Sequence, residues 1–149
     1  MLLAVDVGNT QTLIGLFGDE PDAENGLGGY ADDGQPPVGR CEQGLLDHWR
    51  IHTNGRRTSD EYALQVQEFL GFHGFSFDDD VDGIAISSVV PSVTAALRDM
   101  TLKYFGFRPV VIEAGVKTGM PILTENPREV GADRIANAVG AADLYDGPI

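Results

Sequence analysis

Residues 4–17 read AVDVGNTQTLIGLF, and this stretch decides the fold. Two apolar runs flank the polar centre DVGNT, which predicts a strand over residues 2–7, a short turn and a second strand over residues 12–17. The short connection makes the two strands a hairpin. A hairpin needs a turn, but it does not need an acid at the end of its first strand, so Asp6 raises a question of function.

The composition changes directly after this hairpin. Residues 18–43 contain seven acidic residues and one arginine, are rich in glycine and proline, and have almost no apolar periodicity. This composition predicts a flexible surface loop, with a role as an acidic docking loop as the alternative. The apolar pattern resumes in residues 45–52, LLDHWRIH, which predicts the third strand of one antiparallel meander.

Two amphipathic helices are predicted downstream of the meander. Thr58 and Glu61 form a capping box at the start of the first helix, which is expected to end within residues 71–74. Pro91 suits the first turn of the second helix, and Gly106 stops it. The residues predicted to face inward are Tyr62, Val66, Phe69 and Leu70 in the first helix, and Val93, Leu97, Met100 and Tyr104 in the second.

Strands and a final helix complete the predicted order. Residues 81–90 are expected to form a buried strand, and residues 109–112 a short one. Residues 114–130 contain glycine and proline breaks that predict a loop, and residues 131–146 return to a helical pattern. The inner face of this helix is predicted to carry Ile135, Val139 and Ala142. The sequence therefore predicts an α/β fold with a mixed sheet, in which alternating helices and strands follow a three-strand antiparallel meander.

Composition limits the classes of function. The 149 residues fit one domain, or one domain and a piece of a second, and no apolar run is long enough to cross a bilayer. The N-terminus lacks the basic region of a signal peptide, and the single cysteine, Cys41, suits a reducing cytoplasm. The formal net charge of −13 repels nucleic acid and acidic membranes. Binding phosphate would therefore require local backbone donors, a metal ion or a few well-placed cations.

The DVGNT segment has the residue types of a phosphate-binding turn. Gly8 removes a side chain where the backbone turns, so an anion can approach the amides of Asn9 and Thr10. The side chains of Thr10, Gln11 and Thr12 add further donors. Asp6 would repel a phosphate unless a hydrated Mg²⁺ lay between them. The alternative is a tight turn beside a solvated carboxylate.

A second candidate cluster opens the last predicted helix. Asp133 lies in its first turn, where the helix N-terminus stabilises a carboxylate by roughly 0.3–1 kcal/mol. Beside the Gly131 amide, this carboxylate would orient a hydroxyl and accept its proton, and Arg134 would clamp a carboxylate or phosphate. The alternative is that Asp133 only caps the helix and Arg134 makes a surface ion pair.

Other polar residues give weaker indications. The histidines His48, His52 and His73 lack metal-ligand spacing with one another or with Cys41, which argues against a zinc site. The pair Ser87-Ser88 ends a predicted strand but lacks the G-x-S-x-G context of a hydrolase nucleophile.

Four segments together resemble one family. In chain order they read DVGNTQTLIGLF, WRIHTNGRRTSDEYALQVQEFL, IAISSVVPSVTAAL and GVKTGMPILTENPREVGADRIANAVGAADLY, and they are similar to type III pantothenate kinase. The resemblance implies an actin-like ATPase or ribonuclease H-like fold of the acetate and sugar kinase, Hsp70 and actin superfamily. It places a first actin-like domain at residues 1–115 with an acidic insertion at 18–43. Residues 116–149 would be a linker loop and the first helix of a second domain that is largely missing.

The resemblance also implies a reaction and its site. The reaction is ATP-dependent phosphorylation of pantothenate to 4'-phosphopantothenate, the first step of coenzyme A biosynthesis, in a cytoplasmic homodimer. Asp6 would act on the Mg²⁺ side, and Asp133 would accept the proton. A monovalent cation, K⁺ or NH₄⁺, would have its ligand beyond Ile149. The ATP- and phosphate-binding residues would be Asp6, Val7, Gly8, Asn9, Thr10, Gln11, Thr12 and Leu13, and the substrate-binding residues Gly131, Ala132, Asp133, Arg134 and Thr124.

The chain departs from the family pattern at three places. Thr124 stands where the family usually has a tyrosine that touches substrate, and Glu113-Ala114-Gly115 replaces a common Gly-Pro-Gly. The chain also ends where the second domain is expected to begin. These departures leave two alternatives to an active kinase: an inactive fragment that binds nucleotide or pantothenate, and a regulatory or scaffold protein on the same fold.

Overall fold

The computed structural model describes residues 1–18, 44–113, 116–119, 121–123, 125–126 and 129–144. The acidic insertion predicted at 18–43 therefore lies almost wholly outside the described residues, as does Thr124.

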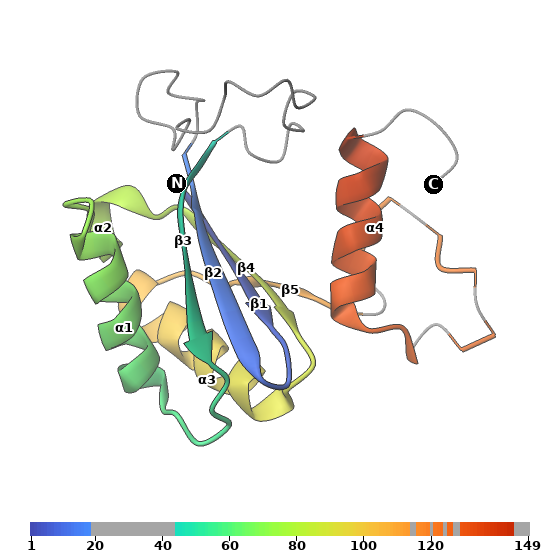
Figure 1. Ribbon diagram of the computed structural model, residues 1–149, viewed down its shortest axis with the longest axis horizontal. Helices are drawn as coiled ribbons and strands as arrows, with labels where there is room; N and C mark the ends of the chain where they lie inside the picture. Colours follow the sequence, from blue (N-terminus) through green and yellow to red (C-terminus); the bar gives the residue numbers. More distant parts are fainter. Residues whose placement is uncertain (19–43, 114–115, 120, 124, 127–128, 145–149) are drawn as a thin grey trace, which may run out of the picture.

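A five-stranded mixed sheet organises the described part of the chain (Figure 1). Its strand order is β3-β2-β1-β4-β5. β1 pairs antiparallel with β2 and parallel with β4, β2 pairs antiparallel with β3, and β4 pairs parallel with β5. The strands are β1 (Leu2–Val7), β2 (Gln11–Phe17), β3 (Leu45–His52), β4 (Gly83–Ser88) and β5 (Val110–Ile112).

The predicted meander and the mixed sheet are confirmed. β1 and β3 have their predicted bounds, and β2 begins one residue early, at Gln11. β4 is two residues shorter than the predicted strand at 81–90 at each end; after its last residue the Val89 amide still donates to the Val7 carbonyl, and Val90 is the N-cap of the next helix.

Helices α1 (Ser59–Gly71) and α3 (Pro91–Met100) cover one face of the sheet (Figure 1). The capping box is confirmed: Thr58 Oγ1 accepts a hydrogen bond from the Glu61 amide, and Glu61 Oε2 accepts one from the Thr58 amide. α3 continues as the π-helical turn η2 (Thr101–Phe105), which ends at Gly106 with φ 76°. A four-residue helix that the sequence did not predict, α2 (Phe77–Asp80), precedes β4.

The core lies between this face of the sheet and helices α1 and α3. The apolar side chains at alternate strand positions fill it from the sheet, and the predicted helix faces fill it from the other side. Its fully buried members include Leu3, Val7, Ile14, Leu16, Ile86, Tyr62, Val66, Leu70, Val93, Leu97 and Met100.

Helix α4 (Ala132–Leu144) lies on the opposite side of the sheet, where it contacts β4 and β5 (Figure 1). Ile135 is buried and Val139 half-buried, as predicted. The prediction for Ala142 is wrong, since this residue is exposed. Ala142 lies near the C-terminal end of α4, after the half-buried Gly140 and Ala141.

Candidate active site

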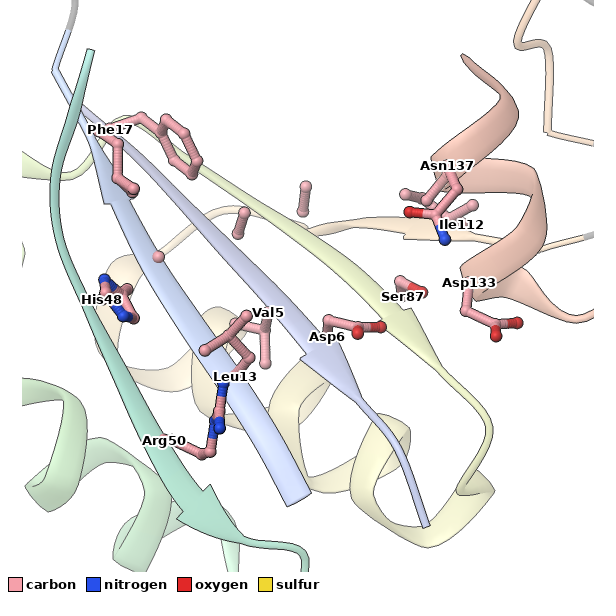
Figure 2. Close-up of a pocket in the computed structure, with 15 residues that line it drawn as sticks. Val5, Asp6, Leu13, Phe17, His48, Arg50, Ser87, Ile112, Asp133 and Asn137 are labelled. Carbon is pink, nitrogen blue, oxygen red and sulfur yellow. The ribbon is translucent and has the colours of Figure 1, made fainter. Parts of the chain in front are cut away.

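A cavity of about 510 Å³ lies between the second face of the sheet and α4 (Figure 2). Five strands form its floor and one side of α4 forms its wall. The residues that line it are Ala4, Val5, Asp6, Leu13, Gly15, Phe17, Leu45, His48, Arg50, Ala85, Ser87, Ile112, Asp133, Ala136 and Asn137.

Strand register arranges the floor of the cavity in rows. Because side chains alternate between the faces of a strand, residues paired across neighbouring strands share a face. One row crosses the whole sheet and consists of Arg50, Leu13, Asp6, Ser87 and Ile112; we call it the polar row after Arg50, Asp6 and Ser87. The next row contains His48, Gly15, Ala4 and Ala85, whose small central residues leave space above the sheet.

The polar row lies near the carboxyl ends of the parallel strands. Asp6 precedes the last residue of β1, and its register partner Ser87 precedes the last residue of β4. In open α/β sheets, ligands bind outside this edge of the strands. The start of α4 brings Asp133 to the same cavity, so the two predicted acidic residues face one space (Figure 2).

Glycine at position 131 determines where the Asp133 carboxylate lies. A Cβ atom on Gly131 would overlap Asp133 Oδ1. The Gly131 carbonyl accepts hydrogen bonds from the amides of Arg134 and Ile135, at 3.1 and 3.2 Å, and so begins α4. The missing side chain thus lets the carboxylate fold back over the positive end of the helix.

The two charged residues of the second cluster point to different cavities. Asp133, Ala136 and Asn137 occur at helical spacing and line the large cavity. Arg134 instead lines a separate cavity of about 160 Å³, together with Ile135 and Val139 from α4 and residues of the preceding segment. The structure therefore does not bring Arg134 to Asp6 and Asp133.

Thr53 holds the tip of the hairpin in place, and the sequence did not single it out. Its hydroxyl donates to the Gly8 carbonyl at 2.8 Å, and its amide donates to the Thr10 carbonyl at 2.9 Å. Its hydroxyl also lies 2.9 Å from that of Thr12. Since the Thr53 proton is used on Gly8, Thr12 is the donor in this pair.

The hairpin tip leaves two backbone donors available. The Gly8 amide donates to the Gln11 carbonyl at 3.0 Å. Within the described part of the chain, no residue accepts a hydrogen bond from the backbone amides of Asn9 and Thr10.

The other predicted phosphate-binding residues differ in exposure. The side chains of Val7 and Thr12 are buried on the core face of the sheet, whereas those of Gln11 and Leu13 are exposed. Leu13 lines the cavity between Asp6 and Arg50. At the start of α4, Ala132 is buried.

Four polar residues that line the cavity were absent from the predicted site: Ser87, His48, Arg50 and Asn137. The alternation of β4 and β3 places Ser87, His48 and Arg50 opposite the core, which the sequence does indicate. Pairing of distant strands then joins them to Asp6, and no local pattern encodes this pairing. Asn137 follows Asp133 by one helical turn, and this spacing indicates that the two side chains share one face of the helix.

The donor set suits a hydrated Mg²⁺. The Asp6 carboxylate is exposed and makes no hydrogen bond or ion pair with any described residue. A second carboxylate and a serine hydroxyl line the same cavity, and Mg²⁺ prefers such oxygen ligands and usually keeps several of its waters. Across the described ranges, no cluster of three or more His, Cys, Asp or Glu side chains forms a cage for a metal.

The fold and site define a class of protein. The strand order β3-β2-β1-β4-β5, with α1 and α3 on one face and α4 on the other, is that of one actin-like α/β domain. The sequence model of the family "Type III pantothenate kinase" matches residues 2–149. The chain belongs to the type III pantothenate kinase family.

Individual relatives agree with the family assignment. The chain is 47% identical to a type III pantothenate kinase of Streptomyces avermitilis over 152 residues, which cover 99% of the chain and 49% of the relative. It is 43% identical to one of Geobacillus sp., covering 100% of the chain and 48% of the relative. It is 46% identical to one of Myxococcus xanthus, covering 97% of the chain and 47% of the relative. The chain thus spans about half the length of these curated relatives.

Among the described helices, none combines the length and apolar character needed to span a membrane.

Proposed function

We propose that this chain takes part in phosphoryl transfer from ATP to the primary alcohol of pantothenate; the relatives it matches are named type III pantothenate kinase. One observation carries the proposal: Asp6, next to the hairpin tip, and Asp133, at the start of α4, line the same cavity. Family membership supplies the reaction class.

The hairpin tip would hold the phosphates. The amides of Asn9 and Thr10 have no described protein acceptor, and Thr53 holds the backbone carbonyls on either side of Asn9. Donors that are fixed before the ligand arrives stabilise charge without further reorganisation. Asp6 would bind the water shell of Mg²⁺, which neutralises the phosphate charge when bound.

Asp133 would orient the alcohol and accept its proton. The alcohol oxygen forms a bond to the γ-phosphorus, the bond from that phosphorus to the bridging oxygen of ADP breaks, and the alcohol proton passes to the Asp133 carboxylate. Because the transition state is loose, Asp133 would contribute more to the rate by orienting the alcohol than by removing its proton before the attack.

Four parts of the proposal concern the whole protein. The whole protein would bind a monovalent cation, K⁺ or NH₄⁺, through a ligand outside this chain. It would form a homodimer in the cytoplasm. Its first domain would span residues 1–115, and its second would begin within residues 116–149. The roles predicted for Val7, Gln11, Thr12, Leu13, Arg134 and Thr124 belong to the same proposal.

A second candidate function is binding of pantothenate or nucleotide without turnover. The observation that favours it is length, because the chain covers only 47–49% of these relatives. Both candidates use the same cavity. They differ in whether ADP is released.

Asp133→Asn tests the kinase proposal. The amide keeps the shape of the side chain but cannot take the proton, so we expect kcat to fall by about a hundredfold or more, with KM for ATP little changed. The assay is pantothenate-dependent release of ADP. Asp99→Asn is the matched control, because the exposed Asp99 carboxylate lies on α3 and makes no hydrogen bond or ion pair with a described residue. A near-normal kcat for Asp133→Asn would remove Asp133 from the mechanism, and pantothenate binding without ADP release by the unmodified chain would favour the second candidate.

A further inference from the structure

The hydroxyl of Ser87 is buried without a hydrogen-bond partner. Ser87 is 6% exposed, and its Oγ meets no donor or acceptor in the described part of the chain. Buried hydroxyls are nearly always paired, because burial removes their hydrogen bonds to water. The other unpaired buried polar atoms among the described residues belong to Arg57, Tyr62 and Gln65, around the start of α1. Ser87 differs from these three in lining the large cavity.

The next residue shows that the strand end does not need Ser87 for its own structure. Ser88 Oγ donates to the Val90 carbonyl at 3.2 Å and accepts from the Val90 amide at 3.1 Å. This local pair stabilises the turn from β4 into α3. Two adjacent serines therefore differ in role, since the fold uses one hydroxyl and leaves the other unpaired beside a cavity.

The position of Ser87 limits what the hydroxyl can bind. It is paired with Asp6 in the parallel register of β1 and β4, and Figure 2 shows its side chain between those of Asp6 and Asp133. Ionised carboxylates only accept hydrogen bonds, so a ligand between them must carry a donor or a bound metal ion. An alcohol carries one donor and two acceptor lone pairs, and a serine hydroxyl is complementary to the acceptor side.

We propose that Ser87 is a further substrate-binding residue, whose Oγ–H donates to the oxygen of the phosphate-accepting alcohol. This inference rests on the proposed function. The alcohol donates its own proton to Asp133, accepts from Ser87 with one lone pair, and directs the other lone pair at phosphorus. No covalent bond forms or breaks at Ser87, which fixes the direction of attack.

The test combines thermal unfolding without ligand and pantothenate affinity by titration calorimetry. For Ser87→Ala, the melting temperature stays the same or rises, because the variant removes an unpaired buried hydroxyl, and Kd for pantothenate rises about tenfold. Ser87→Thr keeps the hydroxyl and restores most of the affinity. Ser88→Ala is the matched control, and it lowers the melting temperature while Kd stays near that of the unmodified chain.

Each outcome has a separate meaning. If Ser87→Ala lowers the melting temperature as much as Ser88→Ala, the hydroxyl is structural and the inference is wrong. If the unmodified chain and Ser87→Ala bind pantothenate equally, the inference is wrong and the proposed function stands. If the unmodified chain binds no pantothenate, the proposed function fails, and the inference fails with it.

Discussion

Single residues determine the direction of each acidic side chain in this cavity. Gly131 leaves the space that the Asp133 carboxylate occupies, and the Asp6–Ser87 register places a carboxylate and a hydroxyl on neighbouring strands. Neither carboxylate is paired with a described cation. The two carboxylates therefore offer acceptors to a ligand that carries donors or a bound metal ion, while the amides of Asn9 and Thr10 can donate hydrogen bonds to anionic groups.

Gly131→Ala tests the role of the glycine. The new methyl group would overlap the present position of Asp133 Oδ1, so the carboxylate must rotate away, and we expect kcat to fall about tenfold or more. Gly140→Ala in the same helix is the control. A Cβ there meets nothing within 4 Å, so alanine raises helix stability by about 0.5–1 kcal/mol and leaves kcat unchanged. Equal kcat values for the two variants would show that the Gly131 space has no part in activity.

At the scale of elements, a polar cluster links α1 to η2, the π-helical turn that continues α3. Asp60 Oδ1 accepts hydrogen bonds from Lys103 Nζ and Tyr104 Oη, each at 2.8 Å. These contacts lower the pKa of Asp60 below its ordinary 3.8, and hydrogen bonding to Asp60 raises the pKa of Lys103 above 10.5. The cluster holds the two helices of the covered face side by side, away from the cavity.

The pKa of Asp60 gives a prediction for acid unfolding. Because the folded pKa is below the unfolded value, the stabilisation is present above about pH 3.8 and is lost as the pH falls through the folded pKa. We expect Asp60→Asn to be less stable than the unmodified chain at pH 7, and this difference to shrink towards zero as the pH falls through the folded pKa of Asp60. Urea unfolding at a series of pH values measures it. The effect is small because both charges are exposed, and a difference that grows on acidification would contradict it.

At the scale of the whole molecule, periodicity predicted most of the fold. The strands, the capping box and the helix faces follow from local patterns in residues 2–17, 45–71 and 83–106, and all are present. The sequence did not predict α2, because a four-residue helix has too few positions to show a period.

The candidate site was only partly predictable. The sequence singled out Asp6 and Asp133 because each lies at the boundary of a predicted element: Asp6 at the end of a strand and Asp133 at the start of a helix. Ser87 and Arg50 join them through pairing between strands far apart in the chain, which alternation alone does not reveal. Arg134 follows Asp133 directly but lines the smaller cavity, since consecutive helix positions face different directions, and its predicted role in substrate binding stays a prediction.

The central claim is that nucleotide phosphates held at the hairpin tip meet the pantothenate alcohol beside Asp6, in the cavity between the sheet and α4. A crystal structure of the chain with pantothenate, Mg²⁺ and a non-hydrolysable ATP analogue tests it most directly. We predict phosphate oxygens at the Asn9 and Thr10 amides, and the alcohol oxygen about 2.6–3.2 Å from the Asp133 carboxylate. Pantothenate bound outside this cavity, or phosphates bound away from the hairpin tip, would contradict the claim.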